Sequence, residues 1–181
     1  ARAGERMSKT ITFDIFDPAS IQRAAQEIRE YSKWVQGKTA ELQERVATLI
    51  ANQARMGFNN SISDDLIGEP AEIGNVAVYV ENNGNVTLVV ASGEDAVFME
   101  FGAGVLYNGA VGSSPNPLGA DLGFTIGSYG KGNGAKTTWG FIGSDGQVHL
   151  THGVPASMPL YKSLMAAKND IVRIAREVFS T

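Results

Sequence analysis

Few residues in this chain of 181 have the types and spacing that chemistry requires. Residues 130–137 (GKGNGAKT) approach the phosphate-binding pattern G-x-x-x-x-G-K-[ST], but Ala135 stands where the second glycine belongs. A phosphate-binding loop also lies between a strand and a helix, whereas a strand is predicted to follow here. We therefore expect a loop that binds no nucleotide.

His149 and His152 are the only histidines, and no cluster of carboxylates accompanies them. They fall in a predicted strand that enters a loop, so we expect surface histidines and no metal site. The absence of cysteine excludes disulfides and thiolate chemistry. Asp64 and Asp65 stand among asparagines, which is typical of a turn or a helix cap. We expect no catalytic residue and no cofactor.

The composition favours a single domain over residues 1–181 with enough apolar residues, 43%, for a core. A net charge of −4 gives no strong field toward DNA or a membrane surface. No apolar run approaches the roughly 18 residues that span a bilayer. The first residues show no signal-peptide pattern, and residues 1–6, which precede Met7, are left out of the fold prediction.

The N-terminal part predicts a short strand over residues 8–16, followed by a long helix that starts at Pro18. The helix has an apolar stripe with a seven-residue period: Ile21, Ile28, Val35, Leu42 and Leu49. Residues 18–55 would span roughly 57 Å as one helix, against a radius of gyration near 16 Å for a compact chain of this length. We expect the helix to break near Gly37 or to project; a coiled coil is the third possibility.

Two hairpins are predicted further along the chain. Residues 73–80 and 86–91 are β-branched runs around Asn-Asn-Gly-Asn, and residues 137–142 and 147–150 flank Gly-Ser-Asp-Gly. Between them, residues 96–101 alternate as a strand with Glu100 on its exposed face or in contact with a neighbouring subunit.

Residues 103–136 hold nine glycines and three charged residues, which predicts a long flexible loop or arm. Ser157 is the predicted cap and Pro159 the first residue of a C-terminal helix. Its apolar stripe is predicted to pack on the sheet: Leu160, Leu164, Ala167, Ile171, Ile174 and Val178. The fold class that results is α+β, with helices at both ends of a mostly antiparallel sheet.

Two short motifs carry a resemblance to a known family. Residues 100–104 (EFGAG) resemble the Glu-Phe-Gly-Thr-Gly signature of phage tail-completion proteins, with Ala103 in place of the threonine. Residues 155–160 (PASMPL) resemble the Pro-Ala-x-Pro-Phe that introduces their C-terminal helix. The order of elements also matches, so the chain resembles the neck or tail-completion family of long-tailed bacteriophages, the group of the lambdoid minor tail protein Z.

The resemblance implies a structural virion protein, assembled in the host cytoplasm, that completes the head-proximal end of the tail and helps to join head and tail. Its partners would be further copies in an oligomeric ring and other neck and tail proteins, with DNA passing through the ring without sequence-specific binding. The expected interface residues are Glu100, Phe101, Gly102, Gly104, Leu106, Tyr107, Leu118, Phe124 and Tyr129. A tail terminator, a head–tail adaptor, and a small ligand-binding or hydrolase domain are the alternatives.

Overall fold

The computed structural model describes residues 10–64, 66, 68, 72–73, 75–103, 114–119, 121–122, 138–143 and 145–180. Its elements run α1 (Pro18–Asn59), β1 (Ile62–Asp64), β2 (Glu72–Ile73), β3 (Ala77–Asn82), β4 (Thr87–Ser92), α2 (Ala96–Phe101), β5 (Trp139–Ile142), β6 (Val148–Thr151) and α3 (Pro159–Phe179). The strands form three antiparallel pairs, β1–β2, β3–β4 and β5–β6. The α+β prediction is confirmed, and so are both hairpins.

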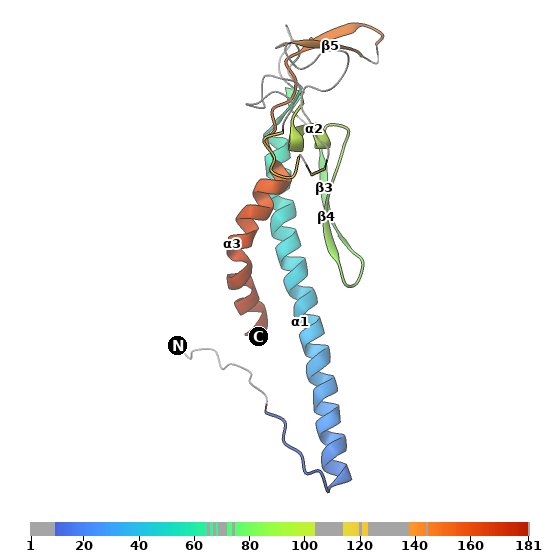
Figure 1. The fold of residues 1–181 in the computed structure, drawn as a ribbon, viewed down its shortest axis with the longest axis vertical. Helices are drawn as coiled ribbons and strands as arrows, with labels where there is room; N and C mark the ends of the chain where they lie inside the picture. Colours follow the sequence, from blue (N-terminus) through green and yellow to red (C-terminus); the bar gives the residue numbers. More distant parts are fainter. Residues whose placement is uncertain are drawn as a thin grey trace.

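Helix α1 is the axis of the molecule (Figure 1). It continues through Gly37 without a break for 42 residues, so the predicted break is wrong and the helix projects beyond the other elements. Asp17 starts it, because the Asp17 carboxylate accepts a hydrogen bond from the amide of Ala19 at 2.9 Å. Gly37 is tolerated because single glycines weaken a helix by only about 1 kcal/mol.

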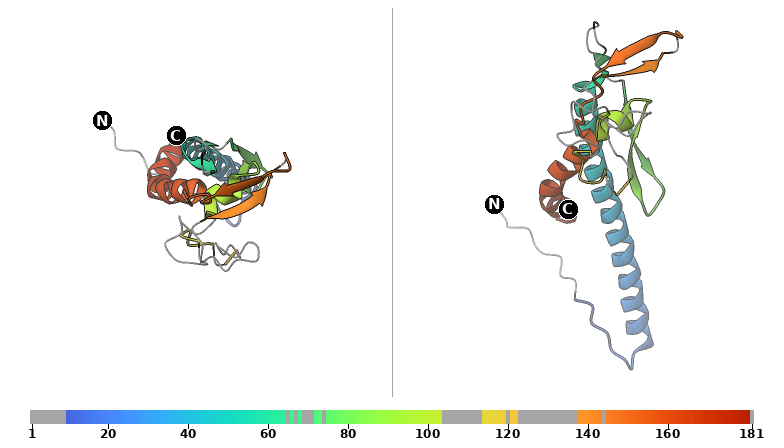
Figure 2. Two further views of the ribbon diagram at one scale, coloured as in Figure 1. Left: turned by 90° about the horizontal axis from the view of Figure 1, so that it is seen from above. Right: turned by 45° about the horizontal axis from the view of Figure 1, so that its top comes forward.

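Helix α3 and the β3–β4 hairpin flank α1 on opposite sides (Figures 1 and 2). The core lies where the upper part of α1 meets the hairpin and α2, with Phe58 and Met99 fully buried at its centre. Most contacts of α3 are with α1, so the prediction that α3 packs on the sheet is wrong. At the lower end of this packing, the ring of Trp34 stacks on Tyr31 and meets the edge of Phe179.

The predicted strand at residues 8–16 is not formed: residues 10–16 are an irregular arm, and residues 8 and 9 lie outside the described part. A strand needs a partner for its backbone groups, and the described strands pair with one another only as β1–β2, β3–β4 and β5–β6. The arm instead uses local bonds, in which the amide of Asp14 donates to the Ser20 hydroxyl and the amide of Phe16 to the Asp14 carboxylate.

Residues 96–101 are also not a strand but the short helix α2. Its buried residues are Ala96, Met99 and Glu100, which is the i, i+3, i+4 spacing of a helix, whereas Val97 and Phe98 are exposed. Alanine, methionine and glutamate favour helix. Gly93 precedes this short helix and Gly102 ends it. Glu100 consequently points into the core, on the face opposite to the one predicted.

Candidate functional site

The two motifs that carry the family resemblance meet in one buried junction. Glu100, only 5% exposed, reaches from α2 to the first turn of α3. One of its carboxylate oxygens accepts a hydrogen bond from the amide of Leu160 at 2.8 Å, and the other from the amide of Tyr161 at 3.0 Å. These amides belong to the first turn of the helix, where backbone donors lack partners within the helix.

Glu100 therefore caps a helix that has no cap of its own. The residue before α3, Met158, adopts a left-handed conformation (φ 56°, ψ 51°), and its side chain makes no capping bond. The predicted cap, Ser157, instead donates from its hydroxyl and its amide to the carbonyl of Met99. A carboxylate at this place also interacts favourably with the positive end of the helix dipole.

Asn116 completes the junction from within the glycine-rich segment. It is 2% exposed, and its side-chain amide donates to the Glu100 carboxylate at 3.0 Å. The hydroxyl of Ser114 donates to the carbonyl of Phe101 at 2.6 Å, which ties the same segment to the end of α2. Residues 114–119 thus pack on the junction, whereas most of the predicted loop or arm of residues 103–136 lies outside the described residues.

Gly102 is the motif residue whose type is required by the backbone. It ends α2 at φ 81°, in the region that L side chains rarely adopt, and it is buried. The next residue, Ala103, exchanges backbone hydrogen bonds of 2.8 and 2.9 Å with Val154, just before the second motif. Gly102 therefore turns the chain, and the backbone bonds of Ala103 join it to the segment that leads into α3.

Burial sets the electrostatics of Glu100. Loss of hydration raises its pKa above the ordinary value, while the hydrogen bonds from Leu160, Tyr161 and Asn116 and the charge of Lys162 act in the opposite direction. Both oxygens are occupied by hydrogen bonds from the protein itself. The arrangement suits a carboxylate that holds two helices and a loop together, a positioning role without a reacting atom.

The other predicted interface residues divide into two groups. Leu118 is about half exposed on the packed segment, next to the junction. Gly104, Leu106, Tyr107, Phe124 and Tyr129 lie outside the described residues. The structure therefore brings together Glu100, Phe101 and Gly102, and it adds Asn116, which sequence reasoning missed because an asparagine between two prolines looks like an ordinary loop residue.

The histidines lie away from this junction. His149 on β6 is 3.1 Å from the carboxylate of Asp145 in the hairpin turn, and the pKa of Asp145 is lowered, first by the backbone amide of Gln147 and then by His149. Within the described ranges, no group of three His, Asp or Glu side chains has the arrangement of a metal site. Residues 130–137 and Asp65 are outside those ranges.

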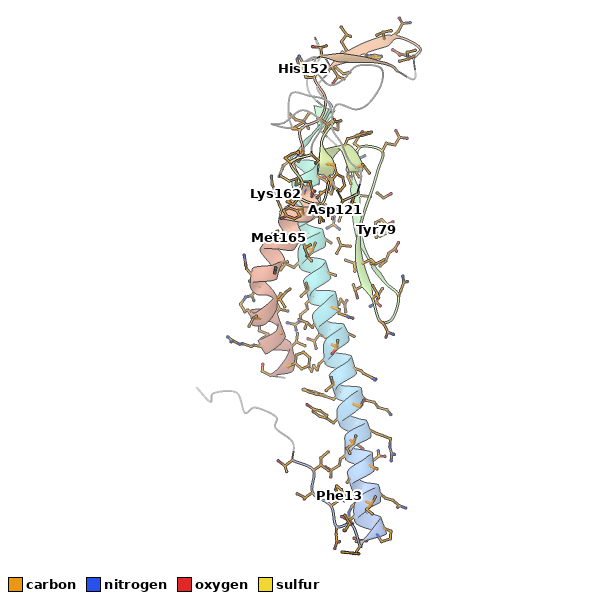
Figure 3. The ribbon with its side chains drawn as sticks, viewed as in Figure 1. Phe13, Tyr79, Asp121, His152, Lys162 and Met165 are labelled. Atoms are coloured by element: carbon orange, nitrogen blue, oxygen red, sulfur yellow. The ribbon has the colours of Figure 1, made fainter. Side chains whose placement is uncertain are left out.

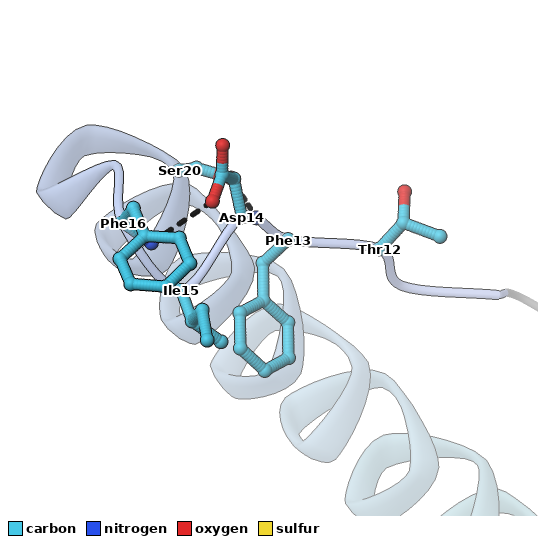
Figure 4. A pocket seen from close by; sticks show the side chains of 6 residues that line it. All are labelled: Thr12, Phe13, Asp14, Ile15, Phe16 and Ser20. Carbon is cyan, nitrogen blue, oxygen red and sulfur yellow. Dashed lines mark hydrogen bonds between the residues drawn. The ribbon is translucent and has the colours of Figure 1, made fainter.

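Two of the hollows on the described surface are lined entirely by described residues. One, of about 360 Å³, lies where α1 crosses the start of α3 and is lined by Gln53, Gly57, Asn60, Ser61, Ser157, Pro159, Lys162, Ser163 and Ala166. The other, of about 520 Å³, lies between the N-terminal arm and the first turn of α1, lined by Thr12, Phe13, Asp14, Ile15, Phe16 and Ser20 (Figure 4). Neither lining combines a histidine or lysine with a pair of carboxylates.

Comparison of the chain with protein-family models, with curated proteins and with solved structures finds no match. Among the helices of the described residues, none has the length and apolar character needed to cross a membrane.

Proposed function

We propose that this chain is a structural protein of a bacteriophage neck or tail, which completes the head-proximal end of the tail and helps to join head and tail as part of an oligomeric ring. The observation that carries the proposal is the junction of the two resembling motifs. The Glu-Phe-Gly motif supplies the carboxylate, and the proline-containing motif supplies the helix start that the carboxylate caps. One structural requirement, a cap for the start of α3, thus accounts for two motifs that are far apart in sequence.

The shape supports the same role. The lower part of α1 extends past the end of α3 (Figure 1), and this distal tip exposes large apolar side chains: Phe13, Ile15, Phe16, Ile21, Ile28 and Tyr31. Contiguous apolar surface on a projecting element marks a site of protein association. A protein that acts by joining others needs such surfaces more than it needs a cleft.

The test is genetic. Interrupting the gene in its parent phage should leave heads and tails unjoined in the lysate, as seen by electron microscopy, because the joining surface is missing. A plasmid copy of the chain should restore infectious particles, and a copy with Lys33→Ala, an exposed change on α1, should restore them equally. Joined, infectious particles without the gene product would refute the proposed function.

A further inference from the structure

Helix α3 has more apolar surface than α1 covers. Its inner face, with Ala167, Ile174 and Val178, is buried against α1. Four large apolar side chains on the neighbouring face remain exposed: Leu164, Met165, Ile171 and Val172. The predicted single stripe is therefore split, because Leu164 and Ile171 belong to the exposed face. In water, an uncovered face of this kind favours association.

The β3–β4 hairpin also has an uncovered face. Val78, Val80 and Val89 lie on the face that packs into the core. The register pairs Tyr79 with Val90 and Glu81 with Leu88, so these four residues share the opposite face. Tyr79 and Leu88 are each about two-fifths exposed, and Tyr79 points away from α1 (Figure 3).

The charges of the two faces are opposite. Beside the exposed apolar residues of α3 stand Lys162, Lys168 and Arg176, none of which is within ion-pair distance of a carboxylate in the described part of the chain. Glu81 on the hairpin and Glu94 just after β4 likewise have no cationic partner among described residues. The sequence from Met56 to Gly130 contains nine acidic residues and no lysine or arginine. Arg55 of α1 does reach the hairpin, but its guanidinium donates to the carbonyl of Val78, a residue of the core-facing side, at 2.6 Å.

One copy cannot bring its own two faces together, because α1 stands between α3 and the hairpin (Figure 2). Figure 3 shows Met165 on α3 and Tyr79 on the hairpin on opposite sides of α1. We propose that the exposed face of α3 in one copy packs on the outer face of the β3–β4 hairpin in the next copy. Such a contact joins two different surfaces, and its repetition closes a ring when the rotation between copies allows it. This inference rests on the proposed ring and specifies which surfaces form it.

Charge reversal tests this pairing. The purified full chain should be oligomeric by light scattering. Lys168→Glu/Arg176→Glu in one variant and Glu81→Lys/Glu94→Lys in another should each place like charges face to face and weaken association by at least about tenfold. Mixing the two variants should restore oligomers in which they alternate. A chain with all four substitutions should also assemble by itself, because the opposite charges face each other again.

The matched control is Arg29→Glu/Lys33→Glu, a double reversal on α1 outside both faces, which should leave the mass unchanged. Circular dichroism of each variant establishes that it is folded. A monomeric wild-type chain, or an oligomer whose mass the two reversals leave unchanged, would overturn this inference. The result is separable from the proposed function, because gene interruption measures particle joining and this experiment measures only the contact between copies.

Discussion

Gly57 of α1 and Pro159 at the start of α3 touch so closely that a Cβ atom added to Gly57 would lie 2.9 Å from the Cβ of Pro159. This contact fixes how near the two helices can come. At Gly37, twenty residues earlier in the same helix, no atom beyond the adjacent backbone of the helix itself lies within 4 Å of the corresponding position. The two glycines of α1 thus differ in their surroundings: the helix crossing leaves no room for a side chain at Gly57, whereas Gly37 has open space.

Substituting alanine at each glycine should therefore have opposite effects. We expect Gly57→Ala to lower the free energy of unfolding by about 1–3 kcal/mol, because the added methyl group overpacks the crossing. Gly37→Ala should raise it by about 0.5–1 kcal/mol, because alanine is the better helix former and its side chain meets only solvent. Urea denaturation followed by circular dichroism measures both. Equal effects at the two positions would show that the crossing is not tight.

Removal of the Glu100 carboxylate should destabilise the fold more than its size suggests. Glu100→Ala leaves the amides of Leu160 and Tyr161 and the side chain of Asn116 without their acceptor, and we expect a loss of about 2–4 kcal/mol. Asn116→Ala should cost about 1–3 kcal/mol. In a double-mutant cycle the two should couple by at least about 0.5 kcal/mol. The exposed Glu44→Ala serves as control, and strict additivity would show that Asn116 acts independently of Glu100.

The pH dependence of stability should identify the same carboxyl group. Because burial raises the pKa of Glu100 above 4.5 in the folded state, the folded chain holds the proton more firmly than the unfolded chain. The contribution of Glu100 to stability is therefore fully present below the ordinary pKa and declines as the pH rises through the folded pKa. The difference in unfolding free energy between wild type and Glu100→Gln, measured from acidic to neutral pH, should shrink accordingly. A difference that grows with pH would mean that the pKa is lowered.

The two faces of α3 should respond differently to a charge. Ile174 is 6% exposed, so Ile174→Asp buries an unpaired carboxylate and should cost several kcal/mol or prevent folding. Ile171 is 38% exposed, and Ile171→Asp should keep the fold while weakening association between copies. Thermal melting and light scattering of both variants distinguish these effects. If Ile171→Asp melted far below wild type, the residue would belong to the core.

The sequence predicted those elements whose signals are local. Proline after aspartate marked the start of α1, and the turn residues between β-branched runs marked both hairpins. Residues 96–101 form a helix and not the predicted strand, because six residues, five apolar and one glutamate, fit either period, and the burial of Ala96, Met99 and Glu100 on one face requires the helical one.

The junction itself could not be predicted from the pattern of residues. Glu100 accepts a hydrogen bond from Leu160, sixty residues further along the chain, and Asn116 donates one to Glu100. Both roles therefore depend on contacts that form only in the folded chain. The resemblance marked Glu100, Phe101 and Gly102 as important without giving the reason. In the structure Glu100 supplies the missing cap of α3, and Gly102 makes the turn that ends α2.

The unbroken course of α1 has a consequence for any change in its length. Its 42 residues form a rod of about 63 Å, which carries the apolar tip at one end and the Glu100 junction near the other. One residue inserted at Gly37 would turn the tip by about 100° against the junction and lengthen the rod by about 1.5 Å, whereas seven would keep its angular position within about 20° and add about 10 Å. The rotation of the tip about the helix axis and its distance from the junction can therefore be changed almost independently. Partners bound at the two ends of α1 would be sensitive to each change separately.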